Sequence, residues 1–236
     1  MHFDSSNGQL TDMTIIFDLD GTLLNTIDDL GYACNYALEQ TGYPTYPIEA
    51  YPAKVGNGIN NLIRRALPEA EQTEENIMRV REFFVPYYNE HNCDFTHPYD
   101  GIPQLLISLK SLGHHLAVAS NKYQAATEKI VNHFFPNMFD VILGEREGVE
   151  RKPNPQIVYD IISQLSTLNS QPSTLYVGDS LVDRDTARNA GVPFVACSWG
   201  YVPREQLVTA GISHIVDHPS DILQKILPEF AHVNFL

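Results

Sequence analysis

The sequence predicts an α/β fold, in which a parallel sheet forms the core and an all-helical domain is inserted into it. From residue 101 onward, short apolar segments typical of buried strands alternate with helical patterns. Between residues 25 and 95 only helical patterns occur. Strands that alternate with helices favour a parallel sheet covered on both faces. We therefore predict a discontinuous core of residues 1–24 and 96–236, and a helical domain of residues 25–95.

Six apolar segments are predicted to be the strands of this sheet. They are Met13–Phe17, Leu116–Ala119, Val141–Leu143, Leu175–Val177, Phe194–Cys197 and Ile215–Val216. The inserted region is predicted to form three helices, over Asp28–Gln40, Ile59–Leu67 and Glu74–His91, with Pro86 bending the last. An insert that follows the first strand directly hangs over the carboxyl end of that strand. This is the position of a lid.

Composition and charge narrow the function. The formal net charge of −14 argues against nucleic acid or an anionic membrane as partner, because both reward Lys and Arg. A small anionic substrate stays possible, since a metal ion and a few basic side chains invert the local field. Cys34, Cys93 and Cys197 lack metal-ligand spacing and are interpreted as buried thiols of a reducing compartment. The polar segment Met1–Asp12 does not resemble a secretory signal and no segment is long enough to span a bilayer, so we expect a cytoplasmic protein.

The most informative residues are the two acids that follow the first predicted strand. Asp18 and Asp20 come directly after the buried segment Met13–Phe17. Alternate residues of an extended chain share a face, so both carboxylates can converge while Leu19 points into the core. Two acids brought together need a cation, a shared proton or a charged substrate. The pattern indicates a metal-assisted site at the edge of the sheet.

Two later strands also end in polar residues. Ser120 and Asn121 follow one strand, where they offer a hydroxyl and backbone N–H groups to an anion; alternatively, one of them only caps the next helix. Asp179 follows another strand and is a candidate ligand for a hard cation. Asp183 could bind the ion through water or orient its ligands, or it could be a helix N-terminal acid favoured by the dipole.

Lys152 lies in the turn Arg151-Lys152-Pro153-Asn154-Pro155, just before a predicted helix. Two prolines restrict the backbone here, so this ammonium enters from a rigid turn. Most loop lysines are solvated. Together with the acids and the hydroxyl, however, Lys152 completes a set suited to phosphoryl transfer, which needs a nucleophile, an acid, a divalent ion and donors for the phosphoryl oxygens.

These motifs resemble those of haloacid dehalogenase superfamily phosphatases, which have a Rossmann-like core and a cap. The four signatures are Asp18-Leu19-Asp20-Gly21-Thr22, Ser120, Lys152 with its Lys-Pro-Asn-Pro turn, and Gly178-Asp179-Ser180 with Asp183. In the insert, Val55-Gly56-Asn57-Gly58 and Arg65-Ala66-Leu67 resemble the cap of phosphoglycolate phosphatases. The chain departs from the family pattern at Asn154, where His or Asp is common, and around Tyr51-Pro52.

The resemblance implies a Mg²⁺-dependent phosphomonoester hydrolase that acts through an aspartyl-phosphate, with Asp18 as nucleophile and Asp20 as general acid and base. Mg²⁺ is expected at Asp18, the backbone carbonyl of Asp20, and Asp179, with Asp183 either a direct or an indirect ligand. Two further sets are implied: Thr22, Ser120, Asn121 and Lys152 at the phosphoryl group, and Gly56, Asn57, Gly58 and Arg65 at the leaving group.

The favoured substrate is a small phosphomonoester, 2-phosphoglycolate, and the chain is expected to be a monomer or a small homo-oligomer. Alternatives within the same chemistry are a nucleotide 5′-phosphatase, a pyrophosphatase and a hexose-phosphate mutase of the β-phosphoglucomutase type. An alternative of a different class is a non-hydrolytic phosphoacceptor module. Such receivers are about half this length and carry no helical insert, and Asp20 would have no purpose in them.

Overall fold

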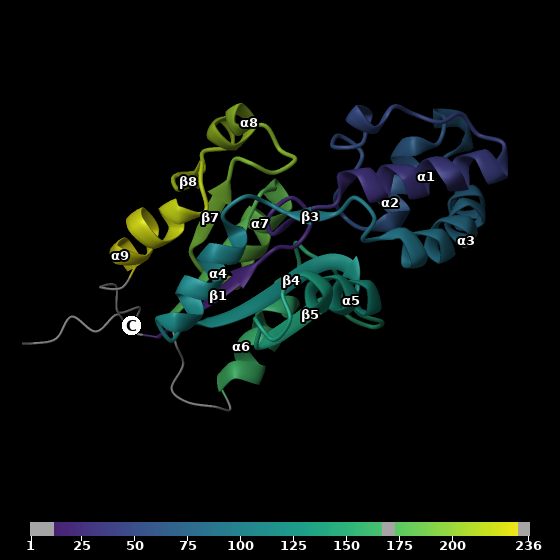
Figure 1. Ribbon diagram of the computed structural model, residues 1–236. Coiled ribbons are helices and arrows are strands. Elements are labelled where there is room, and N and C mark those ends of the chain that lie inside the picture. The colour runs from purple at the N-terminus through teal and green to yellow at the C-terminus, as the bar shows by residue number, and fades with distance from the viewer. Residues whose placement is uncertain (1–11, 167–172, 231–236) are drawn as a thin grey trace, which may run out of the picture.

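The computed structural model describes residues 12–166 and 173–230, and a six-stranded parallel sheet lies at its centre (Figure 1). The strand order is β5–β4–β1–β6–β7–β8. The strands are β1 (Met13–Phe17), β4 (His115–Tyr123), β5 (Val141–Glu145), β6 (Ser173–Gly178), β7 (Phe194–Cys197) and β8 (Ile215–Val216). The predicted α/β class and all six predicted strands are confirmed. Residues 1–11, most of the predicted N-terminal polar segment, lie outside the described residues.

Helices cover both faces of this sheet, as its side-chain alternation requires. Ile15 and Phe17 of β1 belong to one apolar cluster, which includes residues of α4 (Ile102–Ser111) and α5 (Gln124–Phe134). Ile16, between them, belongs to a second cluster with α6 (Gln156–Ser166) and α7 (Leu181–Ala190). The chain then adds α8 (Arg204–Thr209), a π-helical turn (Ile222–Ile226) and α9 (Leu227–Phe230). Because β1 is buried on both faces, it is a continuous apolar run.

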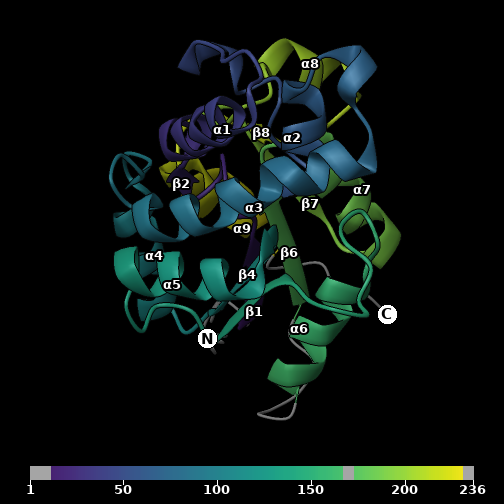
Figure 2. The same cartoon turned by 90° about the vertical axis from the view of Figure 1, so that its right-hand side faces the viewer.

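The inserted region is helical, as predicted. It contains α1 (Ile27–Thr41), α2 (Ile59–Ala66) and α3 (Glu74–His91), with short 3₁₀ turns at Ile48–Ala50 and Glu69–Glu71. These helices group together beside the sheet (Figures 1 and 2). The helix α3 continues through Pro86, and α1 ends at Gly42, whose φ of +80° closes the helix. The boundary of the cap as a separate domain stays a prediction, and we call residues 25–95 the cap.

Two chain segments connect the cap to the core, and they pair with each other. A two-residue antiparallel ladder joins β2 (Leu24–Asn25) to β3 (His97–Pro98). The sequence did not predict this ladder, because two-residue strands carry no periodicity. The buried carboxylate of Asp29 accepts hydrogen bonds from the backbone N–H groups of Phe95 and Thr96, at 3.0 and 2.9 Å. The two segments that connect the cap to the core are therefore held next to each other.

The burial of the three cysteines agrees only in part with the prediction. Cys34 and Cys197 are buried free thiols, whereas Cys93 is half-buried, so the prediction of three buried thiols was wrong for Cys93. Cys93 lies near the end of the cap, where the chain returns to the core and packing is less complete. In the described part of the chain, every helix is too short or too polar to cross a membrane.

Candidate active site

Asp18 is the first residue after β1. Its backbone N–H donates to the carbonyl oxygen of Val177 at 2.9 Å, which extends the pairing of β1 with β6 by one residue. Gly21 then turns the chain with a φ of +87°. A Cβ atom at Gly21 would lie 2.5 Å from Oδ2 of Asp179, so only glycine lets this loop pass so close. The loop at Gly21 therefore packs directly against Asp179, the residue that follows β6.

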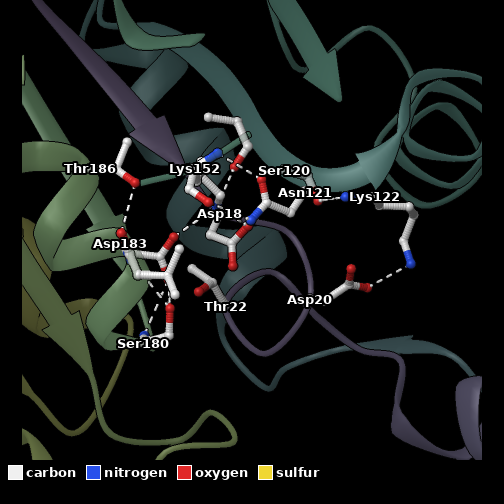
Figure 3. Close-up of polar contacts among 12 residues, drawn as sticks. Asp18, Asp20, Thr22, Ser120, Asn121, Lys122, Lys152, Ser180, Asp183 and Thr186 are labelled. Atoms are coloured by element: carbon white, nitrogen blue, oxygen red, sulfur yellow. Dashed lines mark hydrogen bonds and ion pairs between the residues drawn. The ribbon is translucent and has the colours of Figure 1, made fainter. Parts of the chain in front are cut away.

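Lys152 is buried at the centre of the site rather than solvated (Figure 3). Its Nζ donates to Oδ1 of Asp18 at 2.8 Å and to Oδ1 of Asp183 at 2.7 Å. The carbonyl oxygen of Ala119, at 2.8 Å, and the hydroxyl of Tyr176, at 3.1 Å, complete its contacts. Burial alone lowers the pKa of Lys152, but the two carboxylates outweigh it and raise the pKa well above its usual value. Lys152 thus stays charged.

Asp18, Asp179 and Asp183 form a buried carboxylate cluster, with one oxygen atom of each within 4.8 Å of the others. Burial, followed by the charge of Asp183, raises the pKa of Asp18 from 3.8 to about 7 against the opposing effect of Lys152. Burial and the charges of Asp183 and Asp18 likewise raise the pKa of Asp179 well above its usual value. A set of hard carboxylate oxygens that repel one another fits a divalent cation such as Mg²⁺.

Asp183 is the member of this cluster most engaged with the protein. Its Oδ1 accepts from Lys152, and its Oδ2 accepts from the backbone N–H of Ser180 at 3.2 Å and from the Ser180 hydroxyl. The Ser180 hydroxyl caps α7 in return, which forms a reciprocal capping box. Asp183 is therefore a helix N-terminal acid, and its predicted role toward a metal ion stays a prediction.

The residues after Ala119 extend strand β4 instead of starting a helix. The first residue before α5 is Tyr123, so the alternative in which Ser120 or Asn121 caps that helix is wrong. Asn121 donates from Nδ2 to the carbonyl of Lys152 at 3.1 Å and accepts at Oδ1 from the Lys152 N–H at 2.9 Å. Asn121 therefore fixes the backbone that carries the lysine. Ser120 is buried and also lines the cavity described below.

Thr22 is fully buried, and its hydroxyl lies 3.4 Å from Oδ1 of Asp179. It contacts the carboxylate cluster and is not among the described residues that line the cavity. Its predicted contact with a phosphoryl oxygen stays a prediction.

Asp20 points away from the carboxylate cluster (Figure 3). Its Oδ1 accepts from the hydroxyl of Thr26 at 2.6 Å and pairs with Nζ of Lys122 at 3.0 Å. The phenol oxygen of Tyr201 holds Thr26 in turn, at 2.9 Å from its backbone N–H and 3.0 Å from its hydroxyl. Lys122 also donates to the Tyr88 hydroxyl of α3 at 2.8 Å. The side chain of Asp20 is thus held by groups that include a cation, and its predicted backbone contact to the metal stays a prediction.

The glycine loop of the cap faces this site. Gly56, Asn57 and Gly58 all have positive φ angles, of +102°, +63° and +83°. Arg151, in the turn next to Lys152, donates from Nη1 to the carbonyl of Asn57 at 3.2 Å. Arg65 donates from Nη1 to three backbone carbonyls of the adjoining segment, those of Lys54, Val55 and Gly56 at 2.9, 3.0 and 3.2 Å. The loop is therefore held from both sides, by the cap and by the core.

Core and cap together enclose a cavity of about 270 Å³. Its lining includes predicted site residues from both regions: Asp18, Asp20, Gly56, Asn57, Gly58, Arg65, Ser120, Asn121, Lys152, Asp179 and Asp183. The arrangement offers a carboxylate beside a cation site and, apart from it, a second acid. The cations Lys122, Lys152 and Arg65 also line the cavity, and they favour a small anionic ligand.

Sequence reasoning missed three residues of this site. Lys122 could have been found, because it lies two positions after Ser120 and alternate residues of a strand share a face. Tyr201 follows the strand β7 without a motif that marks it, and its backbone N–H donates to Oδ2 of Asp179 at 2.7 Å. Tyr88 lies in the predicted helix Glu74–His91, where an aromatic residue is typical of a packed core. It is buried there, but its hydroxyl accepts a hydrogen bond from Lys122.

The parallel sheet and the carboxylates and lysine gathered at its edge can now be compared with known proteins. Residues 15–197 match the family of haloacid dehalogenase-like hydrolases. The chain belongs to this family, which confirms the predicted resemblance and the assignment as an enzyme.

Two similar curated proteins are named phosphoglycolate phosphatase. One, from Aquifex aeolicus, is 31% identical over 212 residues, which cover 89% of this chain and 94% of that protein. Another, from Haemophilus influenzae, is 34% identical over 192 residues, which cover 78% and 85%. A crystal structure from Lactobacillus delbrueckii, provisionally given the same name, superposes with a TM-score of 0.85 at 34% identity and covers 92% of this chain and 98% of that one.

Proposed function

We propose that this protein is a Mg²⁺-dependent phosphomonoester hydrolase that works through an aspartyl-phosphate on Asp18, and that its substrate is 2-phosphoglycolate. One observation carries the proposal: Oδ1 of Asp18 lies 2.8 Å from the buried ammonium of Lys152, within the cluster that includes Asp179. The names of the curated relatives support the substrate. The free thiols support the predicted reducing compartment, the cytoplasm.

Asp18, the backbone carbonyl of Asp20 and Asp179 would hold the metal ion, with Asp183 as a further ligand or as a group that orients the ligands, and the ion would supply positive charge to offset the phosphoryl oxygens. The Asp18 carboxylate attacks phosphorus, and the bond from phosphorus to the leaving oxygen breaks. Lys152 stabilises the charge that gathers between the carboxylate and the phosphoryl group, because both are anionic. This step produces an acyl phosphate on Asp18.

Asp20 serves the leaving oxygen. It gives its proton to that oxygen as the ester bond breaks, which releases glycolate with its hydroxyl group protonated. It then takes a proton from the water that attacks the phosphorus of the acyl phosphate. Inorganic phosphate leaves and the Asp18 carboxylate is restored. The cap loop over the cavity keeps other water away during this sequence.

The test is phosphate release from a panel of phosphomonoesters with Mg²⁺, comparing the wild type with Asp18→Asn. We expect 2-phosphoglycolate to be hydrolysed faster than nucleotide 5′-phosphates, pyrophosphate or hexose phosphates, and Asp18→Asn to lose at least about 10⁴-fold in kcat. Asp185→Asn is a matched control, since this acid pairs with Arg184 and Arg188 on α7. Turnover that survives in Asp18→Asn contradicts the nucleophile, and phosphate passed to a sugar identifies a mutase.

A further inference from the structure

Lys122 is a buried cation that the mechanism above does not use. It lies on β4, is 6% exposed, and lines the cavity beside Asp20 and Tyr88. Lys152 already meets the carboxylates of Asp18 and Asp183, so it belongs to the phosphoryl end of the cavity. Lys122 lies on the other side of Asp18, with Asp20 (Figure 3). The cavity is therefore lined by two buried ammonium groups, which pair with different acids.

Burying this second ammonium costs free energy, and Asp20 has another hydrogen-bond partner besides it. A buried charge is expensive unless it is paired and hydrogen-bonded. Asp20 is already held by the hydroxyl of Thr26 at 2.6 Å, which is fixed by Tyr201. Lys122 also reaches across to the cap, to the Tyr88 hydroxyl. Lys122 contacts both Asp20 and the cap residue Tyr88. Its ammonium group can therefore bind a ligand group that enters the cavity at this point.

The position of Asp20 decides which ligand group this is. Under the proposed mechanism Asp20 contacts the leaving oxygen, so its neighbour Lys122 lies where the rest of the leaving alcohol must be. In 2-phosphoglycolate a single carbon separates the ester oxygen from the carboxylate. A carboxylate so close to the leaving oxygen would therefore come within reach of Lys122.

We propose that Lys122, oriented by the Tyr88 hydroxyl, is the specificity-determining residue that binds a carboxylate on the leaving alcohol. The substrate class is then the phosphomonoesters of 2-hydroxy acids. This inference rests on the proposed function. The substrate carboxylate takes over the ammonium that pairs with Asp20, and Asp20 takes up from solvent the proton that it later gives to the leaving oxygen, so neither carboxylate is left as an unpaired buried charge. Burial raises the pKa of Tyr88 well above its usual value, so its hydroxyl keeps a proton.

Arg65 also lines the cavity, from the cap, and its contacts fit a different role. Its Nη1 donates to the carbonyls of Lys54, Val55 and Gly56, and the residue is exposed. These bonds shape the glycine loop. Loss of Arg65 should therefore weaken binding of phosphomonoesters with and without a carboxylate alike, whereas loss of Lys122 should discriminate between them.

The experiment measures kcat/KM for 2-phosphoglycolate and for ethyl phosphate, in which a methyl group replaces the carboxylate. In Lys122→Met the ratio of the two values should fall about 10- to 100-fold, as expected for loss of a hydrogen bond to a charged group. Most of this fall should come from weaker binding of the carboxylate-bearing substrate, seen as a higher KM. Tyr88→Phe, which removes one oxygen atom, should lower the same ratio about threefold. Arg65→Ala is the control and should leave the ratio within about twofold of the wild type.

Two outcomes overturn this proposal and leave the proposed function standing. One is a parallel loss on both substrates in Lys122→Met and Tyr88→Phe, which would make Lys122 a positioning residue for Asp20. The other is a wild-type protein whose kcat/KM for ethyl phosphate equals its kcat/KM for 2-phosphoglycolate. A wild type that releases phosphate from no phosphomonoester instead contradicts the proposed function. If a thermal unfolding experiment shows that Lys122→Met is not folded, the ratio of the two kcat/KM values in Tyr88→Phe tests the proposal instead.

Discussion

Two buried lysines lie in one cavity, and their surroundings differ. Lys152 meets only groups of the core: the carboxylates of Asp18 and Asp183, the hydroxyl of Tyr176 and a carbonyl of β4. Lys122 joins Asp20 of the core to Tyr88 of the cap. The first lysine is held by a rigid sheet, and the second depends on where the cap lies. We infer that Lys152 serves the chemistry common to the family and Lys122 the choice of substrate.

The largest effect should come from removing Lys152. Lys152→Met leaves Asp18 and Asp183 buried without their cation, which should cost about 3–5 kcal/mol of stability in the metal-free protein. It also removes charge that opposes the phosphoryl anion, so kcat should fall about 10³-fold for 2-phosphoglycolate and ethyl phosphate alike. Thermal unfolding and steady-state kinetics measure both.

Lys122→Met is the matched comparison for that experiment. Asp20 keeps the hydroxyl of Thr26 when Lys122 is lost, so this variant should unfold at a higher temperature than Lys152→Met. We assign Lys152 to the chemistry and Lys122 to the choice of substrate. This assignment is wrong if Lys122→Met has both a lower Tm and a lower kcat for ethyl phosphate than Lys152→Met.

The carboxylate cluster predicts a dependence of stability on pH that Mg²⁺ should change. Burial and neighbouring charges raise the pKa of Asp18 from 3.8 to about 7 and raise that of Asp179 in the same direction. A carboxyl group whose pKa is higher in the folded state stabilises the fold below its unfolded pKa, and this contribution is lost as the pH rises through the folded value. The metal-free protein should therefore lose on the order of a few kcal/mol between pH 4 and pH 8.

Bound Mg²⁺ should reverse this loss, because a metal competes with protons for the same oxygen atoms. We expect Mg²⁺ to raise the Tm more at pH 8 than at pH 5, and chelation to abolish turnover. Asp179→Asn should reduce the difference between the two pH values. An equal shift in Tm at both would contradict a metal site on these carboxylates.

A smaller effect is expected where the core holds the cap loop. Arg151→Ala removes the hydrogen bond to the carbonyl of Asn57, at 3.2 Å, without touching Lys152. Loss of a single partly buried hydrogen bond of this kind costs about 1 kcal/mol, so kcat/KM should fall about fivefold on all substrates. Arg146→Ala is the control, because that arginine pairs with Asp160 of α6. If kcat/KM falls as much in Arg146→Ala as in Arg151→Ala, the hydrogen bond between Arg151 and the loop does not contribute to activity.

The smallest effect should follow from Tyr201→Phe. This change removes the hydroxyl that holds Thr26, while the backbone N–H that donates to Asp179 remains. Asp20 should become less well positioned, so kcat should fall about threefold and affinity for Mg²⁺ should not change. Calorimetric titration with Mg²⁺ separates the two. Weakened metal binding would show that Tyr201 acts on the carboxylate cluster instead.

The sequence alone determined the sheet and the chemistry at its edge. β1 was predicted with its observed bounds, and so was α3, because apolar runs and helical periodicity are local properties. Asp18, Lys152, Asp179 and the other motif residues could be placed because parallel strands deliver their exits to one edge. The ladder of β2 and β3 could not be predicted, nor could the extension of β4 through Lys122.

Only the tertiary structure decided what those residues touch. Asn121 holds the backbone of Lys152 from 31 positions away, and Tyr201 meets Thr26 across 175 positions. The place of Arg65 at the leaving group stays a prediction, and only the structure shows that its Nη1 binds the backbone of its own loop. Residue types and local spacing reveal which groups can perform chemistry. Pairing between distant segments depends on how the cap packs on the core, and no local pattern encodes that packing.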